Sequence, residues 1–169
     1  MMAKFKQLKL MIGIPASGKS TYAHYLEKVY ALNNKTVKYV SRDAIRFALV
    51  KGEEAYFSKE KEVFNTFINE IKEGLENYDV VIADATHINQ ASRTKTLRAL
   101  RTALKDVSVT AIVMTTDIEE ALMRNMKRKG LELVPEDAIE HMWARYTEPE
   151  LEEGFDIIYK VPADWQEKK

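Results

Sequence analysis

The sequence predicts a three-layer α/β/α fold with a central parallel sheet of about five strands, and three observations support this prediction. A glycine-rich motif at 13–20 lies between a predicted strand and a predicted helix. Segments with strand character and segments with helical spacing then alternate along the chain, as in a parallel sheet with right-handed crossovers. The run DVVIAD at 79–84 is apolar through its centre, which is typical of a strand buried on both faces.

The elements follow in order from the N-terminus. The strand at 8–12 leads into the glycine-rich motif, and a helix over 21–27 comes next. Alternating or continuous apolar residues predict further strands at 36–41, 79–84, 107–114 and 155–160. Helical spacing predicts helices at 43–50, 58–78, 90–105, 118–129 and 135–146. We expect Gly130 to end the helix at 118–129, and 165–169 to form a polar tail that frays.

Residues 13–20, GIPASGKS, match the phosphate-binding pattern G-x-x-x-x-G-K-[ST] in full. Between a strand and a helix, backbone N–H groups and the positive end of the helix dipole can surround nucleotide phosphates. We expect Lys19 to reach the β- and γ-phosphates of ATP and the Ser20 hydroxyl to bind Mg²⁺. The nucleotide-binding residues predicted from this loop are Gly13, Ala16, Ser17, Gly18, Lys19, Ser20 and Thr21.

Length and composition indicate a single domain over 1–169. Lys plus Arg and Asp plus Glu both number 26, which argues against a non-specific nucleic-acid binder but allows a local basic groove. The absence of cysteine excludes disulfides and thiolate metal sites and fits a cytoplasmic protein. No apolar run approaches the ~18 residues of a membrane span, so no membrane contact is expected. The sequence does not determine the oligomeric state.

Asp43 and Arg46 follow the second predicted strand and lie three residues apart, so they share one face of a helix that starts there. The carboxylate could accept the proton of an attacking hydroxyl, and the guanidinium could hold an anionic acceptor through two hydrogen bonds. In the alternative, Asp43 caps the helix and Arg46 is its partner at the surface. Spacing alone leaves both interpretations open.

Asp84 ends the third predicted strand, where an acid commonly orients Mg²⁺ through water. A simple turn aspartate is the alternative. His87 lies in the same loop, but a lone histidine in a loop usually has no special role, so we do not assign it to catalysis. Tyr56 and Phe57 could stack on a nucleobase, although aromatic residues beside a helix start more often pack in the core.

Arg124 and Arg128 are spaced i, i+4, so we expect both on one helix face within a lid segment around 120–135. A cationic lid that closes on the triphosphate would neutralise charge on the transferring phosphoryl group. The alternative is a solvated charged face. A second basic stripe is interpreted as plain surface and comprises Arg93, Arg98, Arg101 and Lys105.

Together these motifs resemble the kinase domain of the polynucleotide 5′-hydroxyl kinase family, within the P-loop kinases built like adenylate kinase. The similarity extends from about Leu8 to Tyr159. It rests on Gly-x-Pro-x-Ser-Gly-Lys-Ser, Ser-Arg-Asp-x-x-Arg, Asp-x-Thr after the third strand and Arg-Asn-x-x-Arg before Val-Pro.

The resemblance implies a role for each matching residue. Lys19 and Ser20 would bind ATP and the metal, and Asp43 would be the general base. Arg46 would engage a phosphate of the acceptor, and Arg128 would grip the donor phosphates. One departure is His87, which stands where better-known members carry asparagine and which related ATPases share. The other is the absence of the phosphatase signature Asp-x-Asp-x-Thr, which limits the expected activity to phosphorylation.

The leading hypothesis is ATP-dependent phosphorylation of the 5′-hydroxyl of RNA or DNA, with ATP and Mg²⁺ as cofactors. The first alternative is a P-loop kinase of a small hydroxyl metabolite, such as a sugar, nucleoside or antibiotic. The second is an ATP-binding module without kinase turnover. Balanced charge slightly favours a metabolite, whereas Asp43 paired with Arg46 favours an acceptor that carries a phosphate.

Overall fold

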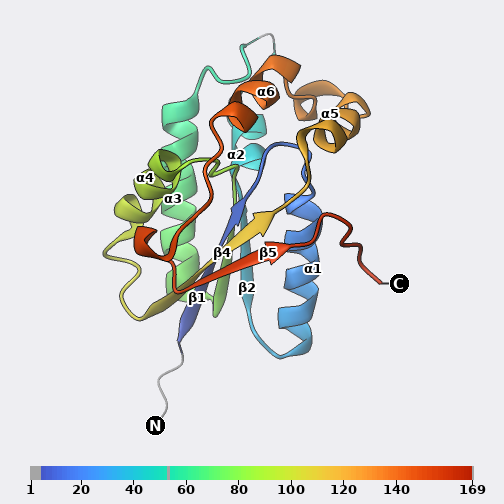
Figure 1. Cartoon of the computed structure of the whole chain (residues 1–169). Helices are drawn as coiled ribbons and strands as arrows, with labels where there is room; N and C mark the ends of the chain where they lie inside the picture. The colour runs from blue at the N-terminus through green and yellow to red at the C-terminus, as the bar shows by residue number, and fades with distance from the viewer. Residues whose placement is uncertain (1–4, 53, 169) are drawn as a thin grey trace.

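Five parallel strands form one sheet in the order β2-β3-β1-β4-β5 in the computed structural model, which describes residues 5–52 and 54–168. Strand β1 is therefore central (Figure 1). The strands are β1 (Lys6–Ile12), β2 (Val37–Ser41), β3 (Val80–Asp84), β4 (Val107–Met114) and β5 (Ile157–Val161). The predicted parallel sheet of about five strands is confirmed.

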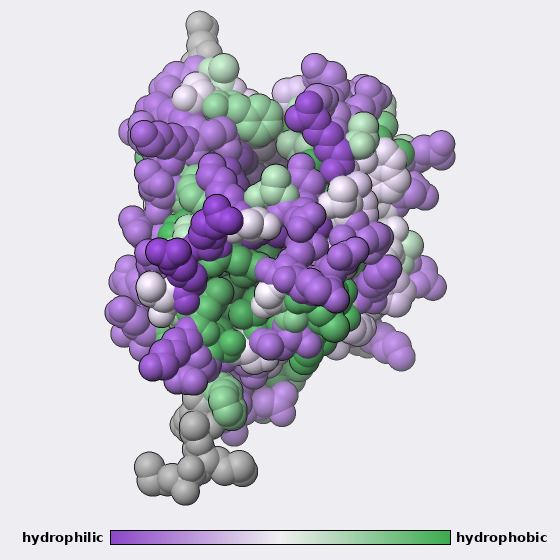
Figure 2. Space-filling model, turned by 60° about the vertical axis from the view of Figure 1, so that its left-hand side comes forward, coloured by the Kyte–Doolittle hydropathy of each residue, from purple (hydrophilic) through white to green (hydrophobic). Residues whose placement is uncertain are grey.

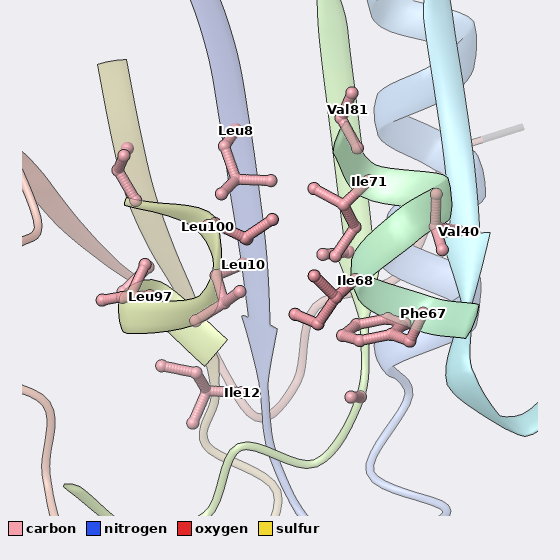
Figure 3. Packing of buried hydrophobic residues seen from close by; sticks show 14 of the residues in the cluster. Leu8, Leu10, Ile12, Val40, Phe67, Ile68, Ile71, Val81, Leu97 and Leu100 are labelled. Atoms are coloured by element: carbon pink, nitrogen blue, oxygen red, sulfur yellow. The ribbon is translucent and has the colours of Figure 1, made fainter. Parts of the chain in front are cut away.

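Helices cover both faces of this sheet, as the three-layer prediction requires. Helix α1 (Lys19–Leu32) covers one face, and α3 (Glu60–Asn77) and α4 (Gln90–Leu100) cover the other (Figure 1). Strand β1 sends alternate side chains to the two sides, because the side-chain period of a strand is two. Figure 3 shows one of these cores, in which side chains of β1 meet those of α3 and α4: Leu8, Leu10, Ile12, Phe67, Ile68, Ile71, Leu97 and Leu100.

The remaining elements gather near the carboxyl ends of the strands. They are α2 (Arg42–Leu49), α5 (Ile118–Met126), η1 (Gly130–Glu132) and α6 (Glu136–Ala144), with η2 (Leu151–Glu153) preceding β5. A separate apolar cluster joins α5 and α6 to the loops after β1 and β3; its buried members are Ile14, Ile88, Ala121, Val134 and Ile139. Ligands of open α/β sheets bind at this edge, so these elements enclose the expected site.

Several details of the predicted elements were wrong; the helix expected over 21–27, for example, is α1 and extends over Lys19–Leu32. The helix expected over 118–129 ends at Met126, and Gly130 instead starts the short η1 turn with a φ of +61°. The helix expected over 90–105 ends at Leu100 and turns follow it. Residues 165–168 do not fray, because Trp165 packs edge-on against Tyr22 with the ring centroids 4.8 Å apart; Lys169 lies outside the described residues.

Among the described residues, none of the helices combines the length and the apolar character needed to cross a membrane.

Candidate active site

The loop between β1 and α1 has the backbone geometry that its glycines predicted. Gly18 has a φ of +96°, and a Cβ added at Gly13 would lie 2.7 Å from the Ser17 Oγ. The Gly13 N–H donates to the Thr86 carbonyl at 2.9 Å, which fixes the loop to the end of β3. The Ser17 hydroxyl is buried and has no hydrogen-bond partner among the described residues. The loop thus leaves a polar group available for a ligand.

Lys19 begins α1 and lies beneath this loop. Its side chain is buried, and its Nζ donates to the Ile14 carbonyl at 2.9 Å. Burial lowers the pKa of Lys19; the carboxylates of Asp84 and Asp43 act in the opposite direction, and the Arg128 guanidinium adds to the lowering. The two carboxylates therefore favour the charged form of the amine, whereas the lid arginine disfavours it.

Ser20 and Asp84 lie side by side, as a shared metal site requires. The Ser20 hydroxyl donates to the Asp84 Oδ2 at 2.9 Å, and the Tyr39 hydroxyl donates to the same oxygen. Burial, together with the Asp84 carboxylate, raises the pKa of Tyr39, so this phenol remains a donor. Tyr39 was missed from the sequence because only the pairing of β2 with β3 brings it to Asp84.

A cavity of about 370 Å³, which we call the lid pocket, opens beside the loop. The loop, the lid segment and the C-terminal segment each provide part of its wall. Its lining includes Ala16, Ser17, Gly18, Thr21, Met114, Thr116, Arg124, Arg128, Pro162, Ala163, Trp165, Gln166 and Glu167. The C-terminal wall is held on α1 by the aromatic contact of Trp165 with Tyr22 and by an ion pair of Lys28 with Glu167 at 3.0 Å.

The two lid arginines line one pocket but do not share a helix face as predicted. Arg124 lies on α5 and its Nε donates to Glu120 at 3.0 Å, whereas Arg128 lies beyond the end of α5. Arg128 donates to the Glu132 carbonyl at 3.3 Å, within the lid itself. The buried Asn125 side chain closes this segment by bonding the backbone of Val134 at 2.8 and 3.0 Å.

A second cavity of about 230 Å³, the Asp43 pocket, borders the same loop at Pro15 and Lys19. Its charged lining consists of Lys19, Arg42, Asp43, Arg46, Glu60 and Asp84. The Asp43 side chain is 55% exposed in this pocket. Asp43 is not the helix cap of the structural alternative, because Ser41 caps α2 by accepting the Ala44 N–H at 3.1 Å.

Arg46 is held by two carboxylates. Its Nε and one terminal nitrogen donate to Glu60 at 2.6 and 3.0 Å, and the other terminal nitrogen pairs with Asp43. The rings of Tyr56 and Phe57 lie 5.1 and 5.3 Å from its guanidinium, so both aromatic residues line the pocket, and Tyr56 also packs against the apolar cluster that contains Ile14. Burial alone would raise the pKa of Glu60, but the two neighbouring guanidinium groups outweigh it and lower this pKa.

His87 and Arg93 are structural groups in the interior. The His87 side chain bonds the Met11 carbonyl through Nδ1 and the Thr96 hydroxyl through Nε2, at 3.0 and 3.1 Å. Burial lowers the pKa of His87 to about 3, so its ring is neutral. The prediction that Arg93 lies at the surface was wrong: it is fully buried and pairs with Glu153 at 2.6 Å.

A family model described as chromatin associated protein KTI12 matches residues 7–157. The chain belongs to the KTI12 family. This match does not confirm the polynucleotide kinase family that the sequence motifs suggested. The P-loop kinase-like fold is confirmed.

Known proteins of similar sequence or structure include kinases. L-seryl-tRNA(Sec) kinase of Methanococcus maripaludis is 26% identical over 161 residues, which are 95% of this chain and 60% of that protein. The chain thus spans three fifths of that curated relative. Chaetomium thermophilum Kti12 in complex with ADP-AlF3 has a TM-score of 0.66 at 20% identity, covering 93% of this chain and 89% of that one. A fungal RNA kinase has a TM-score of 0.64 at 15% identity over 93% of this chain and 38% of its own.

This KTI12-family chain brings the predicted site residues to one edge of the sheet in two groups. The lid pocket is lined by the loop residues Ala16, Ser17 and Gly18, by Thr21 and by the lid arginines, and the Asp43 pocket is lined by Lys19, Asp43, Arg46 and Asp84. Sequence reasoning missed Glu60 and Trp165. Neither is part of a motif, and each reaches the site by contacts with distant segments.

Proposed function

We propose that this chain is an ATP-dependent phosphotransferase that moves the γ-phosphate of ATP to a hydroxyl of an RNA or other polynucleotide, with a 5′-hydroxyl end as the leading acceptor. The observation that carries the proposal is that the glycine loop borders two pockets: Ala16, Ser17 and Gly18 line the lid pocket, and Pro15 and Lys19 line the Asp43 pocket. An enzyme that only hydrolyses ATP needs one pocket and a water. The second pocket offers a carboxylate, Asp43, to a hydroxyl that approaches the phosphoryl group from the opposite side.

In this proposal the lid pocket holds ATP, with its phosphates on the loop N–H groups of residues 13–20 and on Lys19. The hydroxyl loses its proton to the Asp43 carboxylate as its oxygen bonds the γ-phosphorus, and ADP leaves on the lid side. Arg124 and Arg128 would turn toward the charge that develops there, because their contacts in this structure are single and within the lid.

Arg46 holds Asp43 in place in this scheme. Each of its three guanidinium nitrogens already has a carboxylate partner. The acceptor-phosphate contact that the sequence resemblance implied would therefore require Arg46 to leave one of these partners.

The oxygen pair of Ser20 and Asp84 fits Mg²⁺, which prefers one or two protein oxygens together with water and phosphate. Among the described residues there is no cluster of three or more metal-binding side chains, so phosphate and water would complete the coordination. Bound there, the ion would neutralise charge on the β- and γ-phosphates.

Two other functions are supported by particular observations. The Asp43 pocket, about 230 Å³, is small enough for a metabolite, so a kinase of a sugar or nucleoside is one alternative. An ATP-binding switch without transfer is the other, because Arg46 is not free to recognise an anionic acceptor as the structure stands.

Transfer of label from γ-labelled ATP distinguishes the three functions. The acceptors are 5′-hydroxyl RNA and DNA oligonucleotides, a seryl-tRNA and a panel of hydroxyl metabolites. We expect label on the 5′ end of RNA. Label on the seryl group would mean that the acceptor is an RNA but that its reactive hydroxyl is not the 5′-hydroxyl. Label only on a metabolite would refute the proposal. Release of phosphate without transfer would favour the ATP-binding switch.

A further inference from the structure

Positive charge is concentrated in one stretch of this otherwise balanced chain. Between Asp84 and Asp106 there is no acidic residue, whereas five residues are basic. Arg93 points into the interior, but the other four are exposed: Lys95, Arg98, Arg101 and Lys105. None of these four takes part in an ion pair found among the described residues. The exposed side of α4 and the turns that follow it therefore form a basic ridge, with Lys95 and Arg98 on the helix itself.

A shallow apolar groove lies between this ridge and α3. It is lined by Phe64 of α3, by Lys95 and Arg98 of α4 and by small or neutral residues, with no acid in its lining. Figure 2 views the side of the molecule on which α3 and α4 lie, and shows that hydrophilic side chains surround the apolar surface of this side. A separate hollow near the C-terminal end of α4 is lined by Glu76 and Asp106 as well as by lysines. The part of this surface that has basic but no acidic lining residues is therefore the groove toward the N-terminal end of α4, near the candidate site.

The groove begins where the Asp43 pocket ends. The Phe64 ring has the Arg42 guanidinium 5.6 Å from its centroid and the Lys95 amine 4.3 Å from it. Arg42 lines the Asp43 pocket, and Lys95 lines the groove. Arg42, the Phe64 ring, Lys95 and Arg98 thus connect the Asp43 pocket to the groove, with Arg42 paired to Glu60 at 3.2 Å.

We infer that this groove binds the polynucleotide strand next to the reactive end, with its phosphates on Lys95 and Arg98 and a base against Phe64. The inference rests on the proposed acceptor and names the surface that receives it. Basic grooves with an aromatic side chain are suited to single strands, because the backbone is attracted by charge and any base can stack. Helix α4 has 11 residues and is about 16 Å long, enough to follow several nucleotides.

Binding of a 12-nucleotide single-stranded 5′-hydroxyl RNA, followed by fluorescence anisotropy at several salt concentrations, tests the inference. Lys95→Gln/Arg98→Gln should weaken binding about tenfold or more. It should also make the slope of log K against log salt shallower by roughly 1.4, since each phosphate contact on a single strand contributes about 0.7. The matched control is Lys35→Glu, which changes the net charge equally at an exposed position beyond α1. It should leave both quantities unchanged, and the unfolding temperature verifies that each variant is folded.

Equal affinity and slope in wild type and the double variant would overturn the inference, as would an equal loss in Lys35→Glu. Inorganic polyphosphate that competes as well as RNA at equal phosphate concentration would overturn the nucleic-acid assignment. The proposed function can fail separately. If RNA bound this groove without receiving phosphate, the proposed transfer would be refuted, but the inference that the groove binds RNA would not.

Discussion

The lid pocket and the Asp43 pocket both border the glycine loop, but they hold their arginines in different ways. Arg124 is 41% exposed and has one partner a helical turn away, and Arg128 bonds a carbonyl of its own lid. Arg46 is 7% exposed and is fixed by Glu60 and Asp43. Under the proposed function, we therefore expect the lid side to rearrange around ATP, whereas the Arg46 network is already formed before a ligand arrives.

The largest effect is expected at Lys19, the lysine of the glycine loop, which lines the Asp43 pocket. Lys19→Ala should abolish phosphate transfer, because it removes the amine that we propose binds the β- and γ-phosphates. The fold should survive, since the Lys19 amine makes one hydrogen bond to a loop carbonyl. Transfer rates and the unfolding temperature of the variant measure both points. Near wild-type turnover would refute the assignment of the loop as the phosphate site.

Asp43→Asn should lower kcat by about 10²–10⁴, the usual contribution of a general base. Asparagine keeps the size of the side chain, and Ser41 caps the helix in either case, so stability should change little. Single-turnover rates at saturating ATP measure the effect. If the variant retained full activity, Asp43 would not be the general base that accepts the proton of the hydroxyl.

Arg128→Ala should lower kcat by roughly 10²–10³, as for removal of one donor that stabilises transition-state charge. The affinity for ATP should fall less, because Arg128 is proposed to act mainly on the charge that develops in the transition state. Arg145→Ala, at an exposed position after α6, is the matched control. If the substitution lowered the affinity for ATP and left kcat unchanged, the lid would line the pocket without acting in the transfer step.

Glu60→Gln should lower kcat about tenfold. It removes charged hydrogen bonds to Arg46 that are worth about 1.5 kcal/mol or more, so Asp43 loses part of its support. Glu62→Gln, an exposed position on the same helix, is the control and should behave like wild type. A stability loss in Glu60→Gln with unchanged kcat would show that the Arg46 network is not a prepared acceptor site.

The smallest effect concerns acid stability. His87 has a pKa of about 3 when folded and about 6.5 when unfolded, so below pH 6.5 the unfolded chain binds a proton that the native protein does not. The free energy of unfolding should therefore fall as pH drops from about 6.5 toward 3, by up to ~1.4 kcal/mol per unit from this group. Denaturant titrations between pH 5 and 6.5 should show a shallower slope in His87→Gln. Equal slopes would contradict the burial of a neutral ring.

The fold and the nucleotide loop were predictable because their signals are local. Period-two strands, the helical spacing at 58–78 and the glycine motif each specify structure within a few residues. Arg93 could not be placed in the same way, since its partner Glu153 is 60 residues away. Glu60 presents a similar difficulty: it is simply an acid at a helix start until α2 and α3 pack together.

The order in which the chain is made gives the Arg93–Glu153 pair a further consequence. The Arg93 guanidinium also donates to the His87 carbonyl at 3.0 Å, so it connects the turn after β3 to the segment just before β5. Without Glu153 this buried cation has no carboxylate partner, which costs several kcal/mol. During synthesis, we therefore expect the turn that follows Asp84 to reach its final stability only after the segment leading into β5 has emerged. Under the proposed function, a ribosome-bound chain that has already presented its glycine loop would still lack a finished acceptor side.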